Sequence, residues 1–295
     1  MSAEGSSPLL AIIGGSGVYD IEGLSKTRWE KIASPFGVPS DEFFFGELDG
    51  QRLVFLPRHG RGHRIPPSDL NFRANIDALK RVGVTEILSV SAVGSLRAEL
   101  SPGTFVIVDQ FIDRTFARKK SFFGPGLVAH VSVADPVCRR LGDHVGEAAR
   151  AAGIPAVRGG TYLAMEGPQF STRAESELYR AWGCDVIGMT NMPEAKLARE
   201  AEMCYATVAM VTDYDCWHPD HDDVSVEAVV RVLLANAAKA KQLVAALAPR
   251  LRDRKGPCEA GCHRALDTAI ITAPEARDPD MVRMLDAVAG RVLRA

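Results

Sequence analysis

The stretch that decides the fold is CYATVAMVTDYD, residues 204–215. Its apolar run, Cys204–Val211, has the length and composition of a buried β-strand. The run ends at two carboxylates, Asp213 and Asp215, on either side of Tyr214. Buried carboxylates are unfavourable unless they are paired or hydrogen-bonded. Taken by itself, the stretch is also compatible with a polar loop that happens to begin with acids.

Apolar runs of the same kind recur along the chain and alternate with segments of helical periodicity. The strand-like runs are residues 9–15, 51–60, 86–96, 103–113, 160–168, 185–190 and 204–213. The helix-like segments are residues 71–83, 135–153, 173–183, 193–202 and 224–247. This alternation predicts an α/β fold, a single-domain α/β/α sandwich around a central mixed β-sheet. We expect one domain over residues 1–295, with a flexible tail at 1–7 and a divergent C-terminal segment at 250–295.

The composition excludes several functional classes. Of the 295 residues, 46% are hydrophobic and 24% charged, and the net charge is −2. This balance gives no basic surface for nucleic acid and no polybasic membrane anchor. No apolar run is long enough for a bilayer, and the N-terminal residues lack the order of a signal peptide. We therefore expect a cytoplasmic protein. The basic group at residues 114–120 is interpreted as an anion-facing loop or a solvated face.

The cysteines are expected to be reduced thiols. The chain has six, Cys138, Cys184, Cys204, Cys216, Cys258 and Cys262. Their wide scatter is typical of a cytosolic protein rather than of a disulfide framework. Cys258 and Cys262 are four residues apart, but no second pair at zinc-finger spacing accompanies them. The pattern therefore argues against a zinc site and leaves a local disulfide open. We expect no metal and no cofactor.

Small or cationic residues follow three of the predicted strands. Gly14, Gly15 and Gly17 surround Ser16, and glycines allow backbone amides to close around an anion. In the second group, Arg58 offers paired donors to a phosphate and His59 a switchable one. The third group is Ser91, Ala92 and Gly94. Each group also has a structural explanation, namely a turn, a surface ion pair or small packing residues. Their convergence at three strand ends favours a phosphate site.

Taken together, these motifs resemble the trimeric nucleoside phosphorylases. The resemblance rests on ordered blocks that include GGSGVYD, PRHGRGH, SVSAVGSL, MEGPQFSTRAE, GMTNMPEA and TDYDCW. It is greatest with the members that act on S-methyl-5′-thioadenosine. It implies a pentosyltransferase of purine and methionine salvage that splits this nucleoside reversibly with phosphate into adenine and 5-methylthioribose 1-phosphate. Inorganic phosphate would be a co-substrate. The expected assembly is a homotrimer, or a hexamer made of two trimers.

The resemblance also implies a role for individual residues. Phosphate would be held by Ser16, Arg58, His59, Ser91, Ala92 and Thr190. The nucleoside would contact Phe170, Ser171, Met189, Asp213, Asp215, Val226, Val229, Val230 and, from a neighbouring subunit, His130. Phe170 would stack on the purine, Met189 would lie against the ribose, and the three valines would line the methylthio pocket. Core packing explains Met189, Phe170 and the valines equally well on sequence alone, and His130 is compatible with an ordinary surface position.

The two aspartates acquire a chemical task in this context. The purine leaves as an anion, so expelling adenine requires a proton at N7, which an enclosed Asp213 with a raised pKa can supply. Asp215 can accept from the 6-amino group and so reject a 6-oxopurine. Two alternatives remain at this point. One is a phosphorylase for 6-oxopurine nucleosides or S-methyl-5′-thioinosine, and the other is a nucleotide-binding module without catalysis.

Overall fold

The computed structural model describes residues 8–15, 17–219, 226–254 and 256–294, apart from the side chains of 226–229 and 231. The strands that it describes belong to one sheet. Their bounds are β1 Leu9–Gly14, β2 Ser25–Glu30, β3 Phe43–Leu48, β4 Gln51–Pro57, β5 Val84–Ser95, β6 Phe105–Ile107, β7 Gln110–Asp113, β8 Ala156–Arg158, β9 Thr161–Ala164, β10 Val186–Gly188 and β11 Cys204–Asp213.

The sheet is mixed, and β5 is its hub. The main strand order is β2-β3-β4-β1-β5-β10-β9-β7, and β11 continues from β5 to β6 and β8. β1 lies parallel to β4 and β5, and β11 lies parallel to β5. β10 pairs antiparallel with the last residues of β5, beyond the end of β1. β5 is almost entirely buried, and from Ile87 onward its sequence is a continuous run of apolar and small residues.

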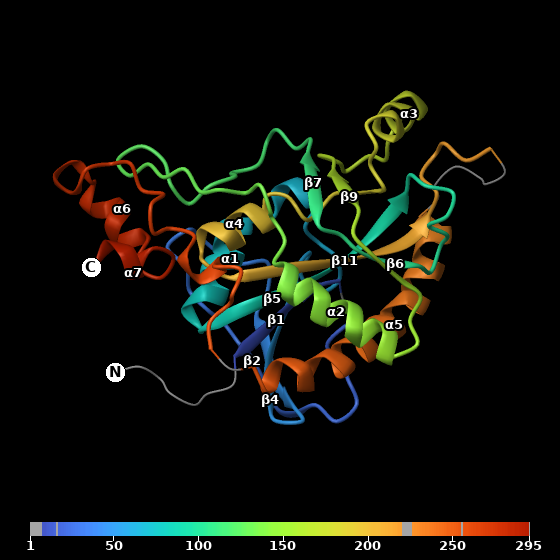
Figure 1. Cartoon of the computed structure of the whole chain (residues 1–295), viewed down its shortest axis with the longest axis horizontal. Helices are drawn as coiled ribbons and strands as arrows, with labels where there is room; N and C mark the ends of the chain where they lie inside the picture. The colour runs from blue at the N-terminus through green and yellow to red at the C-terminus, as the bar shows by residue number, and fades with distance from the viewer. Residues whose placement is uncertain (1–7, 16, 220–225, 255, 295) are drawn as a thin grey trace.

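Helices cover both faces of the sheet, as Figure 1 shows. One hydrophobic core includes α1 and α4, a second includes α2 and α5, and a smaller third includes Tyr179 of α3. The helices are α1 Phe72–Arg81, α2 Arg139–Ala151, α3 Arg173–Ala181, α4 Glu194–Glu200, α5 Val226–Arg252, α6 Pro279–Met284 and α7 Gly290–Leu293, with 3₁₀ turns η1 Pro67–Asp69, η2 Cys262–Arg264 and η3 Pro274–Ala276. The predicted α/β fold with a central mixed sheet is confirmed.

Local sequence explains where several helices begin. The Asn71 side chain accepts a hydrogen bond from the Ala74 amide at the start of α1. Thr172 and Glu175 form a reciprocal capping box at the start of α3. Such caps satisfy amides that have no partner inside the helix and contribute about 1 kcal/mol each. The sequence itself therefore defines where these helices begin, whereas their packing depends on the tertiary structure.

The structure corrects some of the predicted elements. The run at 103–113 is two strands, because β6 pairs with β11 whereas β7 pairs with β9. β2, β3 and β8 were not predicted. β2 is largely exposed and polar, and β8 is exposed and only three residues long, so neither has the apolar run that identifies a strand. The tail at 1–7 lies outside the described residues, and the expectation of one domain stays a prediction.

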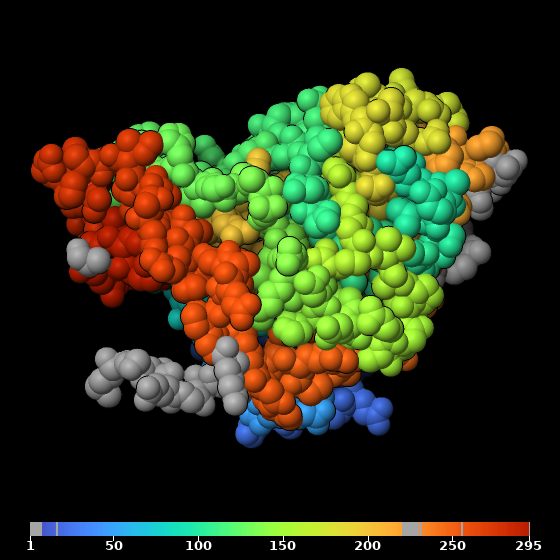
Figure 2. Space-filling view, viewed as in Figure 1, coloured from blue at the N-terminus to red at the C-terminus, as the bar shows by residue number. Residues whose placement is uncertain are grey.

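The C-terminal segment extends the molecule beside the sheet. In the space-filling view the outline is hollowed between this segment, in red, and α3, in yellow (Figure 2). The segment contacts the loop before α2, where Ala129 and Ile270 form an antiparallel bridge. Among the described residues, no helix has both the length and the apolar character needed to cross a membrane.

Candidate active site

The strand ends singled out from the sequence meet at one edge of the sheet. β1, β4, β5 and β11 run in the same direction, so their carboxyl ends lie together. The backbone amide of Arg58 donates to the Gly14 carbonyl at 2.9 Å and joins the ends of β4 and β1. Asp213 pairs with Gly94 at the other side of β5. Ligands of open α/β sheets bind beyond such carboxyl ends.

Buried hydroxyl groups gather next to β5. The Oγ of Ser91 lies 2.9 Å from the Thr190 Oγ1 and 3.2 Å from the Tyr162 hydroxyl. Ser91 and Thr190 are 4% and 8% exposed, and Ala92 beside them is half-buried. Residues 99 positions apart in the sequence thus form one group of donors and acceptors. This group has the chemistry required to hold phosphate oxygens.

Arg58 is buried in an ion pair instead of presenting an open pair of donors. Its guanidinium donates to both Glu194 carboxylate oxygens, at 2.9 and 3.2 Å. It also donates to the Ser89 hydroxyl at 2.5 Å and to the carbonyls of Val90 and Ile13. Burial acts to lower the pKa of Arg58, but the Glu194 carboxylate outweighs it and raises that pKa. A role of Arg58 toward phosphate stays a prediction.

His59 is held as a neutral imidazole. Its Nδ1 lies 2.8 Å from the Ile65 carbonyl, so that nitrogen carries the proton and donates. The ring stacks on His63 with centroids 4.3 Å apart. Burial, and then the positive charge of Arg58, lower the pKa of His59 to about 4. In this tautomer Nε2 is an acceptor and can bind a phosphate oxygen only if that oxygen carries a proton.

The two aspartates lie at an irregularity of β11. The register of β11 against β5 shifts between Val211 and Asp213. Such bulges redirect side chains and are frequent next to active sites. The Asp213 carboxylate accepts from the Thr212 hydroxyl at 2.7 Å and from the Asp215 amide at 2.8 Å. Burial raises the pKa of Asp213, and these two hydrogen bonds oppose the rise.

Asp215 is buried with one carboxylate oxygen unsatisfied. It is 5% exposed, its φ is 52°, and its Oδ2 has no hydrogen-bond partner among the described residues. Burial raises the pKa of Asp215; the nearby Ser176 hydroxyl acts against this rise, and the charge of Asp213 adds to it. A buried acceptor without a donor is unfavourable and calls for an explanation. A donor from a ligand would provide one.

Gly94 allows the aspartates to approach β5. A Cβ atom at position 94 would lie 2.9 Å from the Asp213 Oδ1 and 3.3 Å from the Asp215 Cβ. Both distances are shorter than ordinary van der Waals contact, so any side chain there would displace the acids. Gly94, which was predicted to belong to the phosphate site, therefore also leaves the space that the two aspartates occupy.

The predicted base and ribose contacts lie on segments beside this edge. Phe170 is 46% exposed, so its side chain is accessible from solvent. Ser171 is half-buried, with its hydroxyl 3.8 Å from the Met165 sulfur. Met189 is half-buried and follows β10 directly. These residues are open to a ligand, and their contacts with the nucleoside stay predictions.

Sequence reasoning missed Arg118 and Glu166, which hold this region together. The basic group at 114–120 was interpreted as a loop facing an anion or solvent, but the Arg118 side chain is fully buried. Its guanidinium donates to the carbonyls of Met189 and Met192 at 2.6 Å and of Glu166 at 2.7 Å. Arg118 thus positions the Met189 backbone. No local signal distinguishes it from the neighbouring basic residues.

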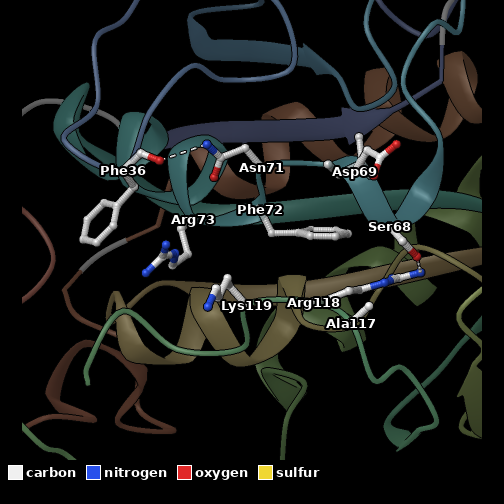
Figure 3. A pocket seen from close by; sticks show the side chains of 10 residues that line it. Phe36, Ser68, Asp69, Asn71, Phe72, Arg73, Ala117, Arg118 and Lys119 are labelled. Carbon is white, nitrogen blue, oxygen red and sulfur yellow. Dashed lines mark hydrogen bonds between the residues drawn. The ribbon is translucent and has the colours of Figure 1, made fainter. Parts of the chain in front are cut away.

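A cavity of about 340 Å³ adjoins this network. Ser68, Phe72, Arg73, Arg118 and Lys119 are among its lining residues, and Figure 3 shows the arginine and lysine side chains below Phe72. The aspartate pair contributes no atom to its lining. The acid pair therefore lies outside this cavity, and the Arg118 side chain links the cavity to the Met189 backbone.

Several predicted site residues are not placed in contact with this group. His130 is exposed, and its amide donates to the Ala269 carbonyl at 2.9 Å. Val230 is 45% exposed. Ser16 and the side chains of Val226 and Val229 lie outside the described residues. An exposed His130 is compatible with the predicted role in a neighbouring subunit, which stays a prediction.

The sequence model of the phosphorylase superfamily matches residues 9–249. S-methyl-5′-thioadenosine phosphorylase of Rhodospirillum rubrum is 69% identical over 99% of this chain and 100% of its own length. The chain belongs to the phosphorylase superfamily, in the family of the S-methyl-5′-thioadenosine phosphorylases. The resemblance found in the sequence motifs is thereby confirmed.

Solved structures of this family have the same fold. A methylthioadenosine phosphorylase from an antarctic soil metagenomic library superposes with a TM-score of 0.90 at 47% identity, over 96% of this chain and 99% of its own. A mutant adenosine/methylthioadenosine phosphorylase of Schistosoma mansoni in complex with methylthioadenosine gives 0.79 at 37% identity, over 84% and 93%. The strand edge that carries the acids therefore belongs to an established phosphorylase scaffold.

Proposed function

We propose that this protein catalyses the reversible phosphorolysis of S-methyl-5′-thioadenosine to adenine and 5-methylthioribose 1-phosphate. The names of the relatives support the substrate, since those with 69% and 62% identity over nearly the whole chain are S-methyl-5′-thioadenosine phosphorylases. The reaction is a pentosyl transfer to phosphate. Its requirements are a proton for the leaving base and a negatively charged nucleophile held below the sugar.

The observation that carries the proposal is the unpartnered Oδ2 of Asp215 beside the protonatable Asp213. An acceptor buried to this extent needs a donor. The 6-amino group of adenine supplies one, whereas the 6-oxygen of hypoxanthine would set two acceptors against each other. Mismatches of this type discriminate by roughly 10⁴-fold or more. The acid pair therefore favours a 6-aminopurine.

Asp213 is the proposed general acid. The sugar becomes oxocarbenium-like as the glycosidic bond breaks, and negative charge develops on the purine. Because burial raises the pKa of Asp213, its carboxyl retains a proton at a higher pH than an exposed aspartate does. The Thr212 hydroxyl and the Asp215 amide fix its orientation. Donation to N7 then neutralises the leaving base.

Phosphate is proposed to bind at the neighbouring strand ends. The Ser91 and Thr190 hydroxyls and the Ala92 amide would form one side of the site, and the family resemblance adds Ser16. His59 forms another side, with its Nε2 directed by the hydrogen bond that Nδ1 makes to Ile65. Catalysis would come from positioning and from electrostatic stabilisation of the cationic sugar, without a protein nucleophile or an organic cofactor.

The assembly proposed from the family resemblance is a homotrimer, or a hexamer of two trimers. In it the exposed His130 of one subunit would complete the pocket that Val226, Val229 and Val230 begin in the next. A cytoplasmic location is proposed because none of the six cysteines forms a disulfide, which fits a reducing compartment. Sedimentation of the active enzyme tests the assembly, and a fully active monomer would contradict it.

The reaction is tested by measuring release of free base from methylthioadenosine, adenosine, inosine and methylthioinosine, each with and without phosphate. We expect phosphate-dependent release with methylthioadenosine as the preferred substrate, and arsenate should replace phosphate. Equal turnover in phosphate-free buffer would identify a hydrolase. Preference for the 6-oxopurine nucleosides would contradict the function assigned to the aspartates.

A further inference from the structure

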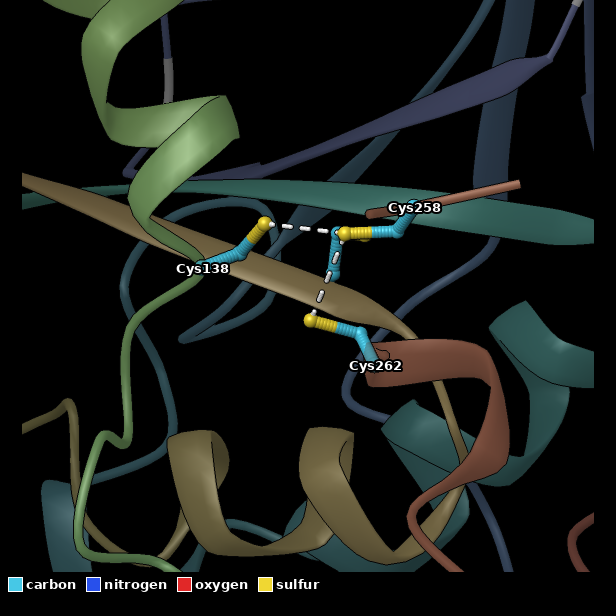
Figure 4. A group of neighbouring side chains, drawn as sticks. Cys138, Cys258 and Cys262 are labelled. Carbon is cyan, nitrogen blue, oxygen red and sulfur yellow. Dashed lines mark hydrogen bonds between the residues drawn. The ribbon is translucent and has the colours of Figure 1, made fainter. Parts of the chain in front are cut away.

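Four of the six cysteines meet in the interior, far from the aspartates. Their sulfur atoms all lie within 4.8 Å of one another, and all four side chains are buried. The Cys138 and Cys258 sulfurs are 3.6 Å apart, and those of Cys258 and Cys262 are 3.8 Å apart. Figure 4 shows these three side chains pointing toward a common centre. The fourth, Cys204, is the first residue of β11.

We propose that Cys138, Cys204, Cys258 and Cys262 bind one zinc ion as a structural tetrathiolate site. Tetrahedral zinc with bonds to sulfur of about 2.3 Å places its ligands about 3.8 Å from one another. The sulfur–sulfur distances of 3.6 and 3.8 Å agree with this edge length, and the other pairs lie within 4.8 Å. Disulfide sulfurs lie only about 2.05 Å apart. Four mutually close, closed-off thiols fit a structural zinc site better than they fit two crosslinks.

The surroundings supply the charge that such a site needs. Zinc with four thiolates carries two net negative charges. The Arg140 Nη2 lies 3.5 Å from the Cys204 sulfur, and the Arg199 Nη1 lies 3.5 Å from the Cys262 sulfur. Two guanidinium groups therefore donate hydrogen bonds to two different proposed ligands, as the groups around metal-binding residues commonly do. Arg140 is also paired with the buried Glu86 carboxylate, and its Nε and Nη1 have no hydrogen-bond partner among the described residues.

A second cavity provides an approach to the cluster. It has a volume of about 260 Å³, and its lining includes Cys204, Cys258, Arg254 and His263. A metal site needs both suitable ligands and a path by which the ion enters. The cavity meets the second requirement because it reaches two of the four proposed ligands. Neither Asp213 nor Asp215 is among the residues that line this cavity.

The proposed ion would fasten the C-terminal segment to the sheet. Cys138 precedes α2 and Cys204 begins β11, whereas Cys258 and Cys262 lie after α5. The segment beyond the cluster contacts the loop that carries His130, through the bridge between Ala129 and Ile270. The ion would therefore stabilise this segment and, through it, the loop. It would have no part in the bond-breaking step.

This site revises the interpretation of the cysteines as scattered and of zinc as disfavoured. The spacing of Cys258 and Cys262 is the only local signal in the sequence. Their partners are distant, since Cys138 and Cys258 are 120 residues apart in the chain. Short-range spacing rules cannot detect ligands that the sheet and the C-terminal segment bring together. Only the folded structure shows that Cys138 and Cys204 lie next to Cys258 and Cys262.

The test is elemental analysis of the full-length protein, purified under reducing conditions after growth with zinc. We expect one zinc per chain. Cys258→Ser and Cys204→Ser should each lower the zinc content at least 10-fold, whereas Cys184→Ser, which changes a buried thiol outside the cluster, should leave it unchanged. No bound metal, iron in place of zinc, or full zinc retention by both cluster variants would overturn the proposal.

Two further measurements keep the proposal testable if the variants fail to fold. Wild-type protein grown with cobalt in place of zinc should show the intense charge-transfer absorption of tetrahedral cobalt thiolate. Mass spectrometry of wild-type protein denatured without reductant should show no mass loss from disulfide formation. Absence of the cobalt spectrum, or two disulfides among these cysteines in freshly prepared protein, would refute the site.

Discussion

Two buried carboxylates of this protein have opposite surroundings. Glu194 is surrounded by donors: Arg58 contacts both of its oxygens, and the Ser89 and Tyr205 hydroxyls donate to Oε1 at 2.7 and 2.9 Å. Asp215 is buried to a similar extent, yet its Oδ2 has no donor in the described part of the chain. Both oxygens of Glu194 have hydrogen-bond donors from the protein itself, whereas one oxygen of Asp215 has none.

The difference separates a structural role from a recognition role. A buried charge with a full set of partners fixes the positions of the strands that carry those partners. A buried acceptor without a partner is maintained at a cost to stability, which is expected where a ligand supplies the missing donor. Substitutions at Arg58, Asp213 and Asp215 test this distinction.

Replacing Arg58 should affect stability most. Arg58→Ala leaves Glu194 buried without its cation, which typically destabilises a protein by about 3–5 kcal/mol. Urea denaturation measures the change, and the double variant Arg58→Met with Glu194→Leu serves as the control because it removes both charges. Unchanged stability of Arg58→Ala with a strongly raised phosphate requirement would show that Arg58 acts mainly on phosphate. The distinction drawn between Glu194 and Asp215 would then be wrong.

Replacing Asp213 should affect rate and leave stability nearly unchanged. Asp213→Asn keeps the shape of the side chain but removes the acid. Losing one transition-state interaction of this kind costs about 3 kcal/mol, or roughly 10²-fold in kcat/KM with methylthioadenosine. Methylthioinosine should be relatively less affected. Kinetics with both substrates and a melting curve are required. Unchanged kinetics with a lowered Tm would make this aspartate a structural loop residue.

His59 should make stability depend on pH. Its pKa is about 4 in the folded protein against 6.5 for the ordinary group, so the unfolded chain takes up a proton first as the pH falls. The stabilisation that comes from the neutral His59 is thus fully present above pH 6.5 and is lost as the pH falls toward 4. The loss between pH 7 and pH 5 should be about 2 kcal/mol. His59→Gln should remove this part of the slope. An identical slope in the variant would show that His59 is not held neutral.

Asp215→Asn should produce the smallest effect and should change selectivity above all. The variant replaces a pure acceptor facing the 6-position with a group that can also donate. The ratio of kcat/KM for methylthioadenosine to that for methylthioinosine should fall about 10-fold, a change of about 1.4 kcal/mol. Competition assays with both nucleosides measure this ratio directly. If the ratio does not move while Asp213→Asn shifts it, Asp213 alone selects the base.

The meeting of these strand ends could be predicted from the sequence, whereas the roles of the residues there stay predictions. Arg58, Ser91 and Asp213 stand at or near the ends of apolar runs, and parallel strands bring such ends together. Neither the partner of Arg58 nor the role of Arg118 could be predicted. Glu194 is 136 residues from Arg58 in the chain, and Arg118 resembles every other member of a basic group until its burial is known.

Local sequence accounts for the alternation of strands and helices, for the caps of α1 and α3, and for the acids that end β11. These features depend on local periodicity and on side chains that contact their own backbone. The tertiary structure decided which charges are satisfied: it gave Glu194 a full set of donors, left Asp215 with an open oxygen, and gathered four distant thiols. The physical reason is that partners of buried polar groups come from segments far apart in the chain, and only the packed sheet brings them within hydrogen-bonding or coordination distance.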